Sequence, residues 1–174
     1  MNRHTKILVS SGLFLAASVG NAQTTELDGK WVLAVGEDAA SYEIVASLQQ
    51  ESANTIKDEY ATKDINPQLA FRCAPGNPEV SVRIDWRRFI SSFNTEVGFK
   101  ADDGKTLWQK WGVDQSNKIT LSKSAADSQS LVDYLSGGSS LQVEVSPYSE
   151  PPITVEYDLT GLSAALEALR AECQ

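Results

Sequence analysis

Apolar and polar residues alternate with a period of two along much of the chain, and this pattern predicts β-strands. The clearest alternating runs are 69–73, 80–86, 97–101, 107–113, 141–145 and 153–158. Shorter or weaker runs at 27–33, 42–48 and 119–121 predict further strands. The segment Asp102–Lys105 separates two of the runs, and its Asp103-Gly104 pair suits a tight hairpin turn with positive backbone angles.

Two segments follow a helical period instead. The first begins at Ser124, which forms a variant of the capping box with Asp127, and stops at Gly137. The second carries one apolar stripe, and Thr160 is placed to cap it. The stripes consist of Leu131, Val132 and Leu135 in the first segment and Leu162, Leu166, Leu169 and Cys173 in the second. Together the patterns predict a mainly β, antiparallel, sandwich-like fold with two short helices, bordering on the α+β class.

The first 22 residues have the composition of a secretory signal peptide. Arg3 and Lys6 precede an apolar run of about 13 residues, and small residues end at Ala22, where we expect cleavage. The alternative, a transmembrane anchor, needs roughly 20 apolar residues. We therefore expect residues 23–174 to form one periplasmic or secreted domain that does not span the membrane.

The charge of the mature chain excludes several classes of function. Arg3 and Lys6 leave with the signal peptide, so 13 of the 15 basic residues remain against 23 acidic residues, a net charge of −10. A domain with this excess of negative charge is a poor binder of nucleic acid. The single histidine, His4, also leaves, which excludes catalytic triads that need histidine and zinc sites of the usual histidine type. We expect no metal and no cofactor.

The two cysteines are both predicted to point inward. Cys73 shares a strand face with Leu69 and Phe71, and Cys173 continues the stripe of the last helix. In an exported protein, two cysteines most simply form one disulfide, here closing a loop of 100 residues. The alternative is a pair of buried free thiols.

A candidate binding surface comes from a group of cations and two tryptophans. Arg83, Arg87 and Arg88, with Arg72 on the neighbouring strand, form a group of cations in an otherwise acidic chain. We expect Arg83 and Arg87 to share the outer face of a strand, where they suit a carboxylate or phosphate. The alternative is pairing with acids of the chain itself. Trp108 and Trp111 lie three residues apart in a strand, so one faces the core and the other faces outward.

Evidence for a catalytic site is weaker, and we assign no catalytic residue. Glu144, Glu156 and Asp158 could face one another across the hairpin of the last two strands, and glycosidase-like chemistry would need two such carboxylates at a set separation. In a chain with 23 acidic residues such groupings arise freely.

Several structural residues together resemble the VasI/TagO family of exported proteins associated with bacterial type VI secretion. The shared pattern comprises Leu-x-x-Arg-Cys at 69–73, the strand 80–86, the tryptophan hairpin, the helix ending near Gly137, the run 141–152 and the closing segment 157–162 with Cys173. The similarity is strongest from residue 69 onward. It implies a periplasmic accessory protein of a secretion apparatus and assigns no catalytic residues.

Two functions remain open at this stage. The first is a non-enzymatic periplasmic protein that binds a protein or a cell-envelope component, in association with type VI secretion. The second is a periplasmic hydrolase that acts on cell-wall material through paired carboxylates, or an inhibitor of such an enzyme. A cleft with two converging carboxylates would favour the second function, and an outward patch of arginine and tryptophan would favour the first.

Overall fold

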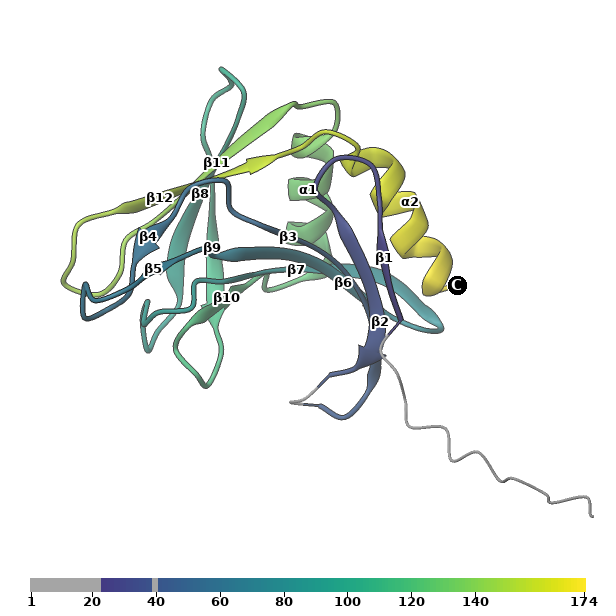
Figure 1. The fold of residues 1–174 in the computed structure, drawn as a ribbon, viewed down its shortest axis with the longest axis horizontal. Coiled ribbons are helices and arrows are strands. Elements are labelled where there is room, and N and C mark those ends of the chain that lie inside the picture. The colour runs from purple at the N-terminus through teal and green to yellow at the C-terminus, as the bar shows by residue number, and fades with distance from the viewer. Residues whose placement is uncertain (1–22, 39–40) are drawn as a thin grey trace, which may run out of the picture.

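The computed structural model describes residues 23–38 and 41–174. Its strands are β1 (Gln23–Glu26), β2 (Val32–Glu37), β3 (Ile44–Glu51), β4 (Ile56–Lys57), β5 (Asp64–Ile65), β6 (Gln68–Ala74), β7 (Asn77–Asp85), β8 (Thr95–Ala101), β9 (Leu107–Val113), β10 (Ile119–Leu121), β11 (Ser140–Val145) and β12 (Ile153–Asp158). The helices are α1 (Ala125–Leu135) and α2 (Leu162–Glu172). Figure 1 shows their arrangement.

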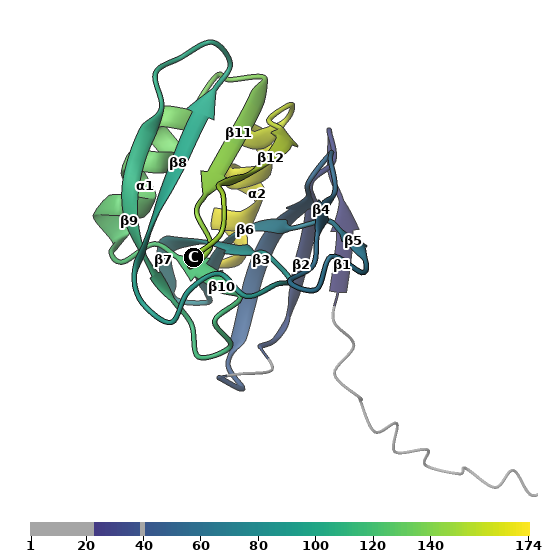
Figure 2. The ribbon, with the colours of Figure 1, turned by 90° about the vertical axis from the view of Figure 1, so that its left-hand side faces the viewer.

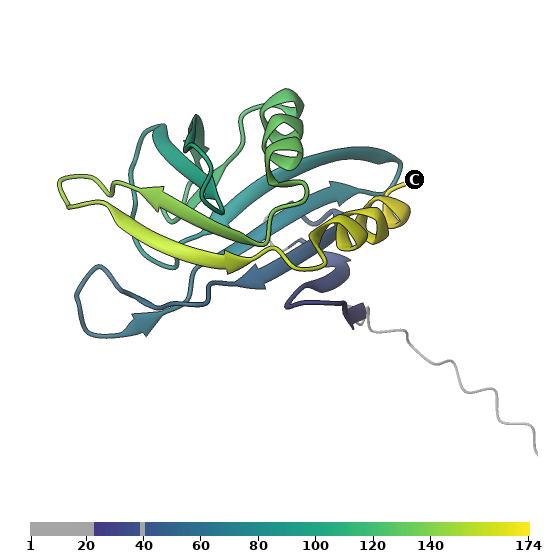
Figure 3. The same ribbon diagram turned by 90° about the horizontal axis from the view of Figure 1, so that it is seen from above.

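Ten of the strands form one antiparallel sheet in the order β1-β2-β3-β6-β7-β10-β9-β8-β11-β12, and β4 pairs with β5 in a separate hairpin. The sheet curls so that β11 and β12 lie across from β3 and β6 (Figures 2 and 3). Alternate side chains of both halves meet in one core, for example Phe71 and Ile84 from one half and Val143 and Val155 from the other. The predicted mainly β, antiparallel fold with two short helices is confirmed.

The outer edge of β12 is joined by side-chain amides to the end of β3 and to the segment that follows it. Gln50 donates to the carbonyl of Asp158 at 3.0 Å and accepts from its backbone N–H at 2.9 Å. Asn54 repeats this exchange with Thr154 and Glu156 at 3.1 and 2.8 Å. These bonds satisfy backbone groups that an edge strand would otherwise expose, so they hold the curled sheet in its closed shape.

Both helices pack on the core side of the sheet. Ser124 caps α1 as predicted, accepting from the backbone N–H of Asp127 at 3.1 Å. The predicted Thr160 cap of α2 is wrong, because the residue at the helix start is Gly161 with φ of 79° and no side-chain cap bond. A Cβ at Gly161 would lie 2.7 Å from the carbonyl oxygen of Asp28, so only glycine fits this close approach.

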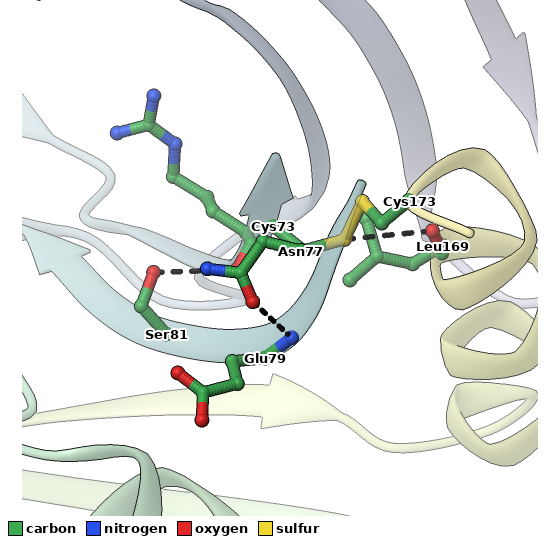
Figure 4. The surroundings of a disulfide bond; sticks show 7 residues. Cys73, Asn77, Glu79, Ser81, Leu169 and Cys173 are labelled. Carbon is green, nitrogen blue, oxygen red and sulfur yellow. Dashed lines mark hydrogen bonds between the residues drawn. A yellow bond between two sulfur atoms is a disulfide. The ribbon is translucent and has the colours of Figure 1, made fainter. Parts of the chain in front are cut away.

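The predicted disulfide is confirmed: Cys73 at the end of β6 is bonded to Cys173 just after α2 (Figure 4). Both residues are buried, as their positions on the apolar faces predict. A disulfide indicates that the protein resides in an oxidising compartment. The predicted signal peptide lies outside the described residues. Of the two helices in the described chain, neither is long and apolar enough to cross a membrane.

Candidate binding groove on the outer face of the sheet

The two tryptophans of β9 point to opposite sides of the sheet, as their spacing predicts. Trp111 is fully buried, with its ring 5.1 Å from that of Phe99. Trp108 is 51% exposed and lies over Gly98 of β8, where an added Cβ would lie 2.8 Å from the indole ring. Trp111 is therefore a core residue, and only Trp108 is available on the surface.

Two of the three predicted arginines make ion pairs within the molecule. Arg88 is only 4% exposed, and its Nη2 lies 2.5 Å from Oε2 of Glu150. Arg87 follows the end of β7 with a φ of 56° and pairs with Glu51 at 2.6 Å. The expectation that Arg83 and Arg87 share a strand face is therefore wrong, because β7 ends at Asp85. Arg88 has no exposed guanidinium to offer a partner.

Arg83 lies in a different setting, on the outer face of β7. In the register of the sheet, Arg83 lies beside Ala70 of β6, and Ala70 lies beside Gln49 of β3. All three residues lie on the side of the sheet opposite the core. Two residues further along β6, Arg72 lies beside Ser47 of β3 on the same side of the sheet. Because alanine and serine are small, the sheet surface is hollow between the two arginines.

The hollow is a groove of about 300 Å³ that β2, β3, β6 and β7 line. Its lining includes the two arginines, the amides of Gln49 and Gln68 and the hydroxyl of Ser47. A second hollow of about 510 Å³ shares Asp38, Val45 and Arg72 with the groove and extends toward the start of α1 and the disulfide. The two hollows therefore adjoin at these three residues.

The groove is lined by two arginines and by the acids Glu37, Asp38 and Asp85, and the position in it that suits an anion is the one beside Arg83. Arg72 pairs with Asp38, whereas the guanidinium of Arg83 has no hydrogen bond or ion pair with any residue that the structure describes. Burial and the neighbouring Arg72 guanidinium lower the pKa of Arg83 below its ordinary value, even though Asp38 and Asp85 act in the opposite direction. A half-buried guanidinium next to another cation gains from an incoming carboxylate or phosphate, which it can bind through two parallel hydrogen bonds.

The carboxylates of the last hairpin do not form facing pairs. Glu144 lies opposite Thr154, and Glu156 lies opposite Gln142. Asp158 accepts hydrogen bonds from the side chain and backbone of Thr160, and these bonds lower its pKa. A general acid needs a raised pKa, so Asp158 in this setting is a structural acceptor.

No group of three or more histidine, cysteine, aspartate or glutamate residues with metal-binding geometry occurs among the described residues. The sequence indicated Arg83 and its neighbour Arg72, but it did not indicate the groove. The signal was present in the small outward residues Ala34, Ser47 and Ala70. Their alignment depends on the register of three strands, which the alternation within each strand does not specify.

No protein-family model matches the chain, and neither does any curated protein. Among solved structures, the chain is similar to the crystal structure of invasion associated protein B from Bartonella henselae, with 19% sequence identity and a TM-score of 0.50. The match covers 86% of this chain and 96% of the other. At this identity the likeness shows a shared fold alone.

Proposed function

We propose that the chain is a non-enzymatic periplasmic protein that binds a carboxylate of a protein or cell-envelope partner in the groove. The observation that carries the proposal is Arg83, a half-buried cation on the groove floor with no acidic partner within ion-pair distance in the described chain. Burying an unpaired charge costs free energy. A ligand that supplies the missing carboxylate recovers that cost as binding energy.

The carboxylate hydrolase has less support from the geometry. The acids of the β11–β12 hairpin that the sequence singled out lie opposite polar neutral residues, and the pKa of Asp158 is lowered by its hydrogen bonds. Retaining and inverting glycosidases both need one carboxyl group that stays protonated as the acid. Binding therefore accounts for the arrangement better than hydrolysis or inhibition of a hydrolase does.

The test uses two forms of one short glycine-alanine peptide, one with a free C-terminal carboxylate and the other amidated. Binding to the mature protein is followed by the NMR signals of the arginine Nε–H groups. We expect the free acid to shift the Arg83 signal and the amidated peptide to leave it unchanged. Arg83→Gln should abolish the backbone shifts around the groove without lowering the melting temperature, because Arg83 makes no ion pair in the described chain.

Arg87→Gln is the matched control, since Arg87 is an exposed arginine already paired with Glu51. It should retain the response to the free acid. Equal responses to the acid and the amide, or equal loss in both variants, would contradict a carboxylate site at Arg83.

The resemblance to the VasI/TagO family supplies a biological setting for this proposal, as an accessory protein of type VI secretion. In that setting, a strain carrying Arg83→Gln should secrete less of the type VI substrates, while a strain carrying Arg87→Gln secretes normal amounts. Normal secretion by both strains, together with peptide binding lost only in Arg83→Gln, would reject the setting and keep the groove.

A further inference from the structure

Four segments meet at the end of the molecule opposite α2 and the disulfide. They are the β4–β5 hairpin (56–65) and the loops 86–94, 114–118 and 146–152, which we name together the loop end. The β4–β5 hairpin and the β11–β12 loop project side by side at the left of Figures 1 and 3, away from the C-terminus. The loop end does not include the groove residues.

Polar contacts link the four segments of the loop end to one another. Buried Arg88 donates to the carbonyl of Lys57 at 2.9 Å and pairs with Glu150. Lys118 pairs with Glu59 at 3.2 Å. Backbone bonds add to these, as Tyr148 N–H donates to the carbonyl of Ile90 and Ile90 N–H donates to that of Asn117, both at 2.8 Å. The segments are therefore held in one arrangement before any partner binds, which lowers the entropy lost on association.

The same segments present large aromatic side chains to solvent. Tyr60 is 77% exposed, Phe93 is 73% exposed and Tyr148 is 67% exposed. Of the large apolar side chains exposed on the described chain, only Tyr42 matches these three. Aromatic side chains are enriched at the energetic centres of protein interfaces. None of these three rings belongs to the hydrophobic core of the described residues.

The loop end is also free of net charge. Its basic residues are Lys57, Lys63, Arg87, Arg88 and Lys118, and its acidic residues are Asp58, Glu59, Asp64, Asp114 and Glu150. The five charges of each sign cancel, so the net charge of −10 of the mature chain lies entirely on the remainder of the molecule. Two copies of such a molecule repel each other unless they meet through the neutral end.

We propose that the loop end is the surface through which two copies of this chain associate. A two-fold contact brings the exposed aromatic rings of one copy against an identical surface that has no net charge. It also places the two acidic remainders as far apart as the molecule allows. In this arrangement Tyr60, Phe93 and Tyr148 lie in the interface, and both grooves stay open for ligands.

Sedimentation velocity of the oxidised mature protein over a wide range of concentrations tests this proposal. We expect reversible dimerisation that becomes tighter as salt is added, because salt screens the repulsion between the acidic remainders. The double change Phe93→Ser and Tyr148→Ser should weaken dimerisation by at least about tenfold, the loss of one strong interface contact. Its melting temperature at a concentration where the wild-type protein is monomeric should stay unchanged.

Tyr42→Ser is the matched control, because Tyr42 is as exposed as Tyr60 but lies between β2 and β3, outside the loop end. It should leave dimerisation unchanged. The proposal is overturned if the wild-type protein remains a monomer at every concentration, or if Tyr42→Ser weakens association as much as the double change. Binding of the monomer to neutral phosphatidylcholine vesicles that the double change abolishes would assign the rings to a lipid surface and also overturn it.

Discussion

The two ends of the curled sheet are both held by contacts between distant segments, but the contacts differ in kind. At the helix end, Cys73 and Cys173 are joined across 100 residues, and Leu162, Leu166 and Leu169 point into the core. At the loop end, buried Arg88 joins the β4–β5 hairpin to the loop 146–152, and the aromatic rings are exposed to solvent. The helix end thus follows the usual arrangement of apolar groups inside and polar groups outside, whereas the loop end buries one charged side chain, Arg88, and exposes three aromatic rings.

This difference separates stability from function. Burial of leucine and a covalent cross-link stabilise the helix end without any partner. Aromatic rings that are mostly exposed add little to the stability of the monomer, and the polar contacts of Arg88 add less than the disulfide and the buried leucines do while fixing where those rings lie. We therefore expect changes at the helix end to lower the free energy of unfolding most, and changes at the loop end to act mainly on association.

Cys173→Ser should have the largest effect on stability. Closing a 100-residue loop in the unfolded chain corresponds to about 4–5 kcal/mol of unfolding free energy by loop-closure entropy. Urea unfolding of the oxidised wild-type and variant proteins measures the difference, and reduced wild-type protein should unfold near the variant. An unchanged midpoint would mean that the cross-link does not hold α2 to β6.

Leu166→Ala should follow, with a loss of about 2–5 kcal/mol, because the substitution leaves a cavity between α2 and the sheet. Ala164→Lys is the matched change on the exposed side of the same helix and should cost little. Equal losses in the two variants would show that α2 does not bury one face in solution. Thermal and urea unfolding at neutral pH provide both values.

Arg88→Met should cost less, about 1–3 kcal/mol, through the lost hydrogen bonds to Glu150 and Lys57. The carboxylate of Glu150 remains partly hydrated, with 41% of its side chain exposed, so it is not left as a fully buried charge. Arg87→Met removes an exposed pair and should cost only about 0–1 kcal/mol.

Amide hydrogen exchange should also show faster opening of residues 146–152 in Arg88→Met. If Arg87→Met costs as much as Arg88→Met, the buried position of Arg88 has no special role.

Asp102→Asn should have the smallest effect, and that effect should depend on pH. Hydrogen bonds from Ser139 and Ser140 lower the pKa of Asp102 in the folded chain below the usual 3.8. The ionised carboxylate therefore contributes stability above the unfolded pKa, and this contribution is lost as pH falls through the folded pKa. Wild type should be more stable at neutral pH, and the two proteins should converge in strong acid.

Urea midpoints between neutral and strongly acidic pH test this expectation. Asp103→Asn, at the neighbouring carboxylate without these serine contacts, should leave the midpoint at neutral pH unchanged. A difference between Asp102→Asn and wild type that persists in strong acid would contradict the assigned cause.

Much of the architecture was predictable because it depends on local periodicity. The alternation in 69–73 and 141–145 fixes which side chains face inward, and the helical stripe does the same for Leu162 to Leu169. The disulfide followed from the presence of only two cysteines, each on an apolar face. The candidate site was less predictable, since Arg83, Arg87 and Arg88 are neighbours in sequence but lie in three different environments.

The sequence by itself therefore determined the inward and outward sides of each element, because the direction that a side chain faces in a strand or helix depends on the period of that element alone. Only the tertiary structure decided which outward residues meet. Strand register aligned Arg72 and Arg83 over small residues, and loop packing buried Arg88 beside Glu150. The N-cap of α2 is Gly161 and not Thr160, because the carbonyl of Asp28 approaches too closely for any residue with a Cβ. These outcomes depend on contacts between segments far apart in the chain, and no local pattern contains them.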